Sequence, residues 1–169
     1  MLELIVLGLF PGLVLLAATT DVFTYTIPNK LNLVLVALFF IAAPLAGLSL
    51  EMIAWHTGAA LAVLVLTFIL FMTGTFGGGD AKLVTAVMLW FGPAAGLDYL
   101  LYASLLGGLI TAAIVLGRTQ ASSLMFSPRA AWLVPLLNKE MGIPYGIALG
   151  GAAMYLWPQT FWFEMAIGF

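Results

Sequence analysis

The sequence predicts an all-α protein embedded in a membrane, with six transmembrane helices in one bundle. Hydrophobic residues make up 64% of the chain and charged residues only 7%, whereas a soluble domain has about 25% charged residues. Several apolar runs approach the length that crosses a bilayer as a helix, about 20 residues. Polar or glycine-rich stretches separate these runs. We therefore expect a single transmembrane domain over residues 1–169.

The expected spans follow from where each apolar run starts and stops. A polar segment, residues 21–32, separates the first run from the second, and Glu51 marks a turn before the third. Three glycines at 77–79 precede the fourth run, and Gly92-Pro93 ends it because proline interrupts a helix. The six expected spans are residues 2–20, 33–50, 53–73, 81–95, 97–117 and 143–160.

The segment between the last two runs, residues 118–141, is longer and more polar than the other connections. Its apolar residues share one face if 128–138 is helical, although Pro135 interrupts that pattern. Two interpretations stay open for this segment. It is either an amphipathic helix lying in the membrane interface or a solvated linker.

The placement of the charged residues predicts the orientation. With six spans, all five Lys and Arg residues fall on one side, and four of the seven acidic residues fall on the other. Basic loops face the cytoplasm, so both termini are expected on the extracytoplasmic side. An aromatic belt is expected near that outer boundary. Its members would be Trp55, Tyr99, Tyr102, Trp157 and Trp162.

The composition also excludes several kinds of site. The chain has no Cys and one His, which excludes disulfides and thiol catalysis and argues against a His-based metal cluster. We expect no metal and no other cofactor. No run of basic residues indicates nucleic-acid binding, so the lipid bilayer is the partner that the composition itself implies.

Asp21 and Asp80 are the two carboxylates that the topology brings to one depth. Asp21 follows the first span, which runs inward, and Asp80 precedes the fourth, which runs outward, so both lie at the cytoplasmic boundary. Two close carboxylates in a poorly hydrated place hold a single proton between them. The ionised one takes a proton from water while the protonated one polarises a carbonyl. Such a pair suits peptide hydrolysis.

The glycines before Asp80 are expected to have a role as well. Gly77 to Gly79 would take positive φ and let a substrate backbone approach closely. Two other interpretations of the aspartates stay open at this point. They would serve as helix caps or as the site of a proton-coupled transporter.

Three short motifs follow one another along the chain. Asp21 is followed by Ile27-Pro28-Asn29, Gly77-Gly78-Gly79-Asp80 is followed by Lys82, and residues 143–148 read Ile-Pro-Tyr-Gly-Ile-Ala. Together with six spans, they resemble the type IV prepilin peptidases, a family of intramembrane aspartyl proteases with a Gly-x-Gly-Asp motif. The resemblance covers nearly the whole chain.

The resemblance implies an aspartic endopeptidase in the cell inner membrane. Such enzymes cut the leader from prepilins or pseudopilins, whose leader precedes a hydrophobic helix, at the cytoplasmic face. Asp21 and Asp80 would be catalytic, supported by Gly77, Gly79, Pro28 and Asn29. Lys82 would meet an anionic part of the site or anchor the chain at the membrane surface.

The departures from larger members indicate a subtype. The chain lacks the paired Cys motifs and the methyltransferase region of those members, and it is similar to the short peptidases of tight-adherence (Flp-type) pilus systems. Archaeal preflagellin peptidases are a nearby alternative. A small proton-coupled transporter subunit that uses the same aspartates is the alternative from another class.

Overall fold

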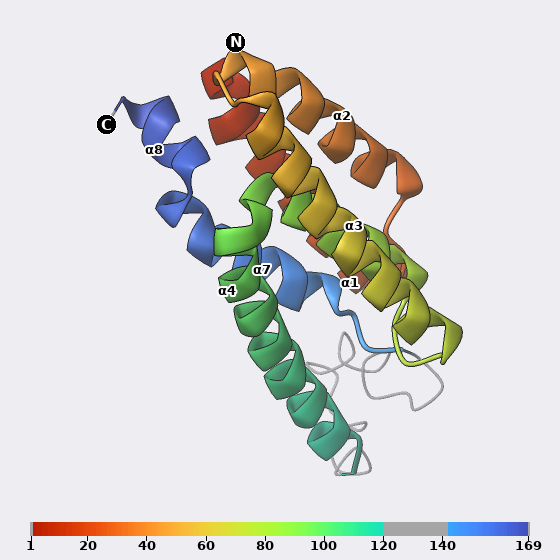
Figure 1. Ribbon diagram of the computed structural model, residues 1–169. Helices are drawn as coiled ribbons and strands as arrows, with labels where there is room; N and C mark the ends of the chain where they lie inside the picture. Colours follow the sequence, from red (N-terminus) through yellow and green to blue (C-terminus); the bar gives the residue numbers. More distant parts are fainter. Residues whose placement is uncertain (1, 120–141, 169) are drawn as a thin grey trace.

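The computed structural model describes residues 2–119 and 142–168, which contain helices and no strand (Figure 1). The all-α class is therefore confirmed for the described residues. The interfacial helix expected at 128–138 lies outside them. The helices are η1 (Leu4–Leu9, π-helical), α1 (Phe10–Thr24), α2 (Asn29–Leu45), α3 (Leu50–Met72), α4 (Gly78–Thr119), α7 (Gly146–Leu156), η3 (Trp157–Gln159, 3-10) and α8 (Phe161–Ile167).

Three helical stretches are long and apolar enough to cross a membrane: Leu4–Thr24, Leu50–Met72 and Gly78–Arg118. The second and sixth expected spans are shorter as helices than the sequence predicted. α2 has 17 residues and ends where Gly47 takes a φ of 75°, and α7 has 11. Six membrane crossings stay a prediction.

Helix α4 changes direction at the expected break, without an intervening loop. Gly92 has a φ of 69° and a ψ of −174°, outside the helical range, and the chain folds back there (Figure 1). The rings of Phe91 and Tyr99 are 5.2 Å apart, whereas residues eight apart in a straight helix are separated by about 12 Å along its axis. Only glycine takes this backbone conformation without strain.

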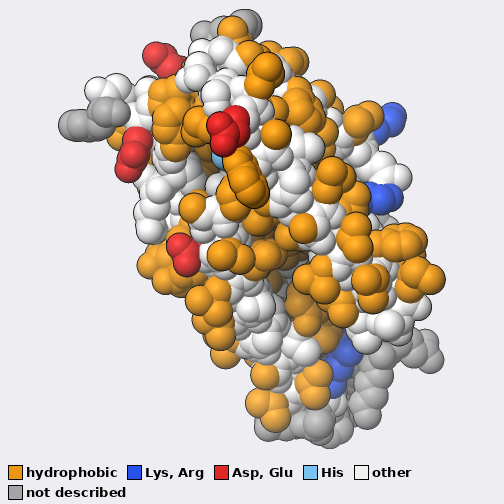
Figure 2. Space-filling view, in the orientation of Figure 1, with side chains coloured by type: hydrophobic (Ala, Val, Ile, Leu, Met, Phe, Trp, Pro, Cys, Tyr) orange, Lys and Arg blue, Asp and Glu red, His pale blue; other side chains and the backbone are white. Residues whose placement is uncertain are grey.

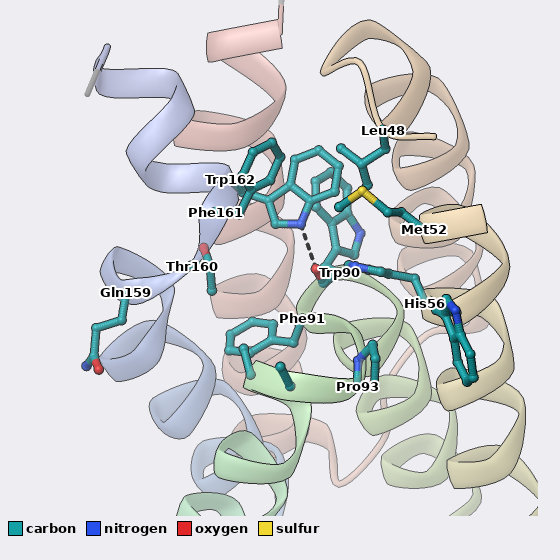
Figure 3. Close-up of a pocket in the computed structure, with 13 residues that line it drawn as sticks. Leu48, Met52, His56, Trp90, Phe91, Pro93, Gln159, Thr160, Phe161 and Trp162 are labelled. Carbon is teal, nitrogen blue, oxygen red and sulfur yellow. Dashed lines mark hydrogen bonds between the residues drawn. The ribbon is translucent and has the colours of Figure 1, made fainter. Parts of the chain in front are cut away.

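Two side chains from other helices bind the carbonyls near this bend. Pro93 has no N–H to donate to the Leu89 oxygen four residues earlier, and His56 Nδ1 donates to that oxygen instead, at 2.9 Å. Trp162 Nε1 donates to the Trp90 oxygen at 2.6 Å, as the dashed line in Figure 3 shows. Helices α3 and α8 therefore satisfy acceptors at the bend of α4.

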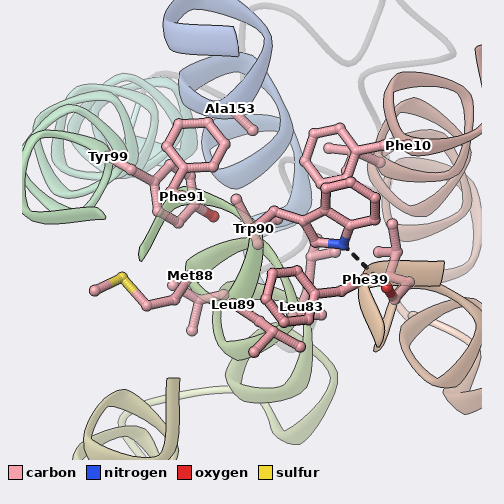
Figure 4. Packing of buried hydrophobic residues seen from close by; sticks show 14 of the residues in the cluster. Phe10, Phe39, Leu83, Met88, Leu89, Trp90, Phe91, Tyr99 and Ala153 are labelled. Atoms are coloured by element: carbon pink, nitrogen blue, oxygen red, sulfur yellow. Dashed lines mark hydrogen bonds between the residues drawn. The ribbon is translucent and has the colours of Figure 1, made fainter. Parts of the chain in front are cut away.

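Trp90 lies at the centre of the hydrophobic core (Figure 4). Its ring centroid is 4.8 Å from that of Phe10 and 4.9 Å from that of Trp162. Its Nε1 donates to the Leu35 oxygen at 3.0 Å. Contacts of this kind between aromatic rings add about 0.5–1.5 kcal/mol each beyond the buried area, so this cluster holds α1, α2, α4 and α8 together.

The aromatic belt is wrong for three of its five expected members. Tyr99, Trp157 and Trp162 are at most 3% exposed. The Tyr99 ring packs on Phe91 across the bend of α4, and the rings of Trp157 and Trp162 pack on Trp90. Trp55 and Tyr102 are 64% and 38% exposed. Of the five expected residues, these two are accessible enough to lie in a membrane interface.

The helices pack around α4, which contacts α2, α3 and α7, while α1 packs against α7. Helix α8 contacts η1, so the N-terminal and C-terminal helices lie at the same end of the bundle (Figure 1). Figure 2 shows a face rich in hydrophobic side chains, with acidic side chains toward the upper left and basic ones toward the right and bottom. A surface this apolar is typical of contact with lipid.

Candidate active site

Asp21 lies inside α1, in its last turn, and not after the end of the first helix as the sequence predicted. The helix ends three residues later, at Thr24, because Tyr25 takes a φ of 52° and its N–H donates to the Asp21 backbone oxygen at 2.8 Å. The Asp21 side chain is 6% exposed. A buried carboxylate needs hydrogen-bond donors, and the backbone N–H of Gly146 supplies one to Oδ2 at 2.8 Å.

Gly146 is glycine because Asp21 leaves no room for a side chain. A Cβ at this position would lie 2.7 Å from the Asp21 Cβ and 2.9 Å from its Oδ2. The sequence indicated Gly146 only as part of the motif at 143–148, and its contact with Asp21 was missed. The motif did place a glycine directly after Pro-Tyr, which indicates close packing at this position. A glycine in a sequence does not indicate which distant residue packs against it.

Asp80 lies in the first turn of α4 and is 9% exposed. Its Oδ1 is buried and has no hydrogen-bond partner among the described residues. An unpaired buried polar group costs about 1–3 kcal/mol, and more when it is charged. Such an atom at the start of a helix is therefore a candidate for binding a ligand or exchanging a proton.

The glycines before Asp80 act through close packing, and the expected positive φ is wrong for them. Positive φ occurs at Gly74, at 72°, and not at 77–79. A Cβ on Gly77 would collide with the Asp80 carboxylate, and one on Gly79 would lie 3.2 Å from the Ile27 Cβ and 3.3 Å from its backbone nitrogen. The glycines therefore let Asp80 fold back on its own loop and let α4 start against the segment before α2.

The two carboxylates line the same two cavities. One cavity has a volume of about 530 Å³ and the other of about 230 Å³. Tyr25 and Gly77 line both as well. Arg118 lines the larger one and Asn29 the smaller one. The expected juxtaposition of Asp21 and Asp80, which are far apart in the sequence, is thus present in the fold.

Tyr25 is a residue of this site that the sequence did not single out. Its left-handed backbone is uncommon for a residue with a side chain, and such strain clusters at functional sites. Its hydroxyl is buried and has no hydrogen-bond partner among the described residues. The residue type does not predict this conformation, since only glycine takes positive φ readily.

The other motif residues lie beside the aspartates. Pro28 is the residue that precedes the first turn of α2, in an extended conformation. Lys82 donates from Nζ to Asn29 Oδ1 at 2.7 Å, which ties the start of α4 to the start of α2. Among the described residues, no group of three or more His, Asp or Glu side chains is placed to hold a metal ion.

Comparison with known families supports the motifs. Residues 8–112 match the model of the type IV leader peptidase family, which is more than half of the chain. The chain belongs to this family. The expected resemblance is thereby confirmed, and family membership makes the chain a protease. The matched region contains Asp21 and Asp80 and stops before Gly146. No curated protein and no solved structure matches the chain.

Proposed function

We propose that this chain is an aspartic endopeptidase that cleaves the leader peptide of prepilin-like proteins at the cytoplasmic face of the cell inner membrane. The observation that carries the proposal is that Asp21 and Asp80, both buried, line the same cavities. One carboxylate is held by a backbone N–H, and the other has an oxygen without a partner in the described part of the chain. The family match supports a leader peptidase.

The chemistry follows from the pair. The Gly146 N–H stabilises a charge on Asp21, and the start of α4 stabilises one on Asp80. Two such charges repel, so the pair holds one proton. The ionised carboxylate takes a proton from a water, whose oxygen adds to the scissile carbonyl carbon, while the protonated carboxyl donates to the carbonyl oxygen. Collapse of this tetrahedral intermediate breaks the C–N bond, and a proton passes to the leaving amine.

The charge distribution supports a cytoplasmic site. Lys82 bonds to Asn29 beside the aspartates, and Arg118 lines their larger cavity. Glu164 lies on α8, which packs on η1 at the opposite end. Because basic residues favour the cytoplasmic side, we propose that both termini lie on the extracytoplasmic side. The substrate would be a prepilin or pseudopilin with an N-terminal leader and a hydrophobic helix.

The alternatives differ in what the assay detects. A preflagellin peptidase would cleave a flagellin-type leader in preference to a pilin-type leader, so both substrates belong in the experiment. A proton-coupled transporter would move a solute with no cleavage. The family match favours peptidase activity over transport.

The test uses the protein in membranes together with a prepilin-like substrate. Asp21→Asn and Asp80→Asn are each expected to reduce the rate of leader cleavage about 10³-fold or more, since each removes an acid–base group. Asp98→Asn is the matched control, because Asp98 is an exposed carboxylate on the same helix as Asp80. Full cleavage by either catalytic-site variant would refute the paired-aspartate mechanism.

A further inference from the structure

A second groove opens beside the aspartates, between α2, α3 and α4. Its volume is about 430 Å³. Lys30 and Lys82 line it at the starts of α2 and α4, where the helices begin beside the aspartates. Along the helices its walls become apolar, with side chains from all three helices. These wall residues are Leu33, Val36, Leu64 and Ala86.

The groove contains an unpaired amide. Asn32 lines it and is 6% exposed, yet neither Nδ2 nor Oδ1 has a hydrogen-bond partner among the described residues. Buried polar side chains are paired in the large majority of cases, and each unpaired group costs about 1–3 kcal/mol. The amide offers a donor and an acceptor side by side, which is the complement of a peptide group with its C=O and N–H.

The groove adjoins the aspartate cavity. Asn29 lines both the groove and the smaller cavity that contains Asp21 and Asp80. Lys82, which also lines the groove, donates to Asn29 Oδ1 at 2.7 Å. The Asn29–Lys82 contact therefore lies where the groove and the aspartate cavity adjoin.

We propose that the groove between α2, α3 and α4 binds the segment of the substrate that follows the scissile bond, and that the Asn32 amide pairs with a backbone peptide group of that segment. The inference rests on the proposed function. The apolar walls suit the hydrophobic helix that follows a leader. The peptide groups between the scissile bond and the first turn of that helix are the ones free to pair with Asn32, since those inside a helix pair with one another. A phospholipid fits less well, since acyl chains have no hydrogen-bonding groups and glycerol esters only accept. Asn32 is thus a substrate-binding residue and not a catalytic one.

Asn32→Leu tests the proposal, because leucine is close in size and carries neither amide atom. The KM for a full-length prepilin-like substrate is expected to rise about tenfold with kcat nearly unchanged. The matched control is Thr67→Val. Thr67 is also 6% exposed, but its hydroxyl bonds within α3, to the Val63 oxygen at 2.8 Å, so its KM should match that of the wild type.

The outcomes separate this inference from the proposed function. If the wild type cleaves and Asp80→Asn does not, the proposed function holds. An unchanged KM in Asn32→Leu then overturns the groove alone. If the wild type cleaves no leader under any condition, the proposed function itself has failed.

Photo-crosslinking gives a readout that does not depend on how well Asn32→Leu folds. A photoreactive phenylalanine analogue replaces Leu33, which lines the groove and is 70% exposed, in the Asp80→Asn background, so that the substrate stays intact. Crosslinks to the part of the substrate after the scissile bond support the proposal. Crosslinks only to phospholipid or to the leader overturn it. The same analogue at Leu66 on α3, which is 55% exposed, is the control and should not capture that segment.

Discussion

The hydrogen bonding of buried polar groups differs between the two ends of the bundle. At the aromatic end, where Trp90, Trp157 and Trp162 meet near the bend of α4, indole and imidazole groups donate to backbone carbonyls. At the aspartate end, where Asp21 and Asp80 share two cavities, a carboxylate oxygen has no partner within residues 2–119 and 142–168. The first end is packed for stability, and the second is the end that the proposed function assigns to the substrate.

The two ends differ in whether their buried groups without a partner are ionisable carboxylates, and not in the number of such groups. The aromatic end also contains two atoms that have no partner among the residues that the structure describes, Tyr99 Oη and Trp157 Nε1, but both belong to neutral groups. It has a cavity of its own, of about 420 Å³, lined by His56, Trp90 and Trp162 (Figure 3), and no carboxylate lines it. Because burying an ionisable group costs far more than burying a neutral one, Asp80 is the stronger sign of function.

The largest effect after loss of an aspartate is expected for Gly146→Ala. The new Cβ would lie 2.7 Å from the Asp21 Cβ and would push the carboxylate from its place, and a displacement of about 1 Å costs about 100-fold in rate. Leader cleavage by equal amounts of folded protein measures this. Gly12→Ala is the control, since nothing lies within 4 Å of its Cβ. Equal rates in both variants would mean that Gly146 does not position Asp21.

The next effect concerns the aromatic end. Trp162→Phe removes the donor to the Trp90 oxygen, so the free energy of unfolding should fall by about 1–3 kcal/mol. The cleavage rate of the protein that remains folded should be unchanged. Denaturation followed by tryptophan fluorescence, together with the cleavage assay, tests both statements. A loss of activity without a loss of stability would contradict the division between the two ends.

Tyr25→Phe is expected to lower activity without lowering stability, the reverse of Trp162→Phe. It removes a buried hydroxyl that has no partner among the described residues, so stability should stay the same or rise slightly. If that hydroxyl serves the substrate, kcat/KM should fall about tenfold, because a hydrogen bond worth about 1.4 kcal/mol is lost. Wild-type kinetics would show instead that Tyr25 contributes only the shape of the turn.

The smallest effect is expected for Lys82→Gln. The lysine is exposed and donates to Asn29, and exposed polar pairs contribute about 0–1 kcal/mol. Glutamine retains a donor, so cleavage should change less than about threefold. A much larger loss, with normal amounts in the membrane, would indicate that the positive charge meets the substrate.

The sequence by itself predicted the membrane class, the helical class and the juxtaposition of Asp21 and Asp80. These predictions rest on local properties, since the length of an apolar run and the order of Asp21, Ile27-Pro28-Asn29 and Gly77–Asp80 are read along the chain. The bend at Gly92-Pro93 was also predicted, because a glycine and a proline limit the backbone wherever they stand.

Only the tertiary structure decided what faces each of these residues. The Gly146 N–H reaches Asp21 across 125 residues, and Trp162 reaches the Trp90 oxygen across 72. The extension of α1 past Asp21, the burial of three expected belt residues and the unpaired amide of Asn32 depend likewise on helices that pack together from distant parts of the chain. The sequence names the groups, and packing between distant helices decides which of them find a partner among the described residues.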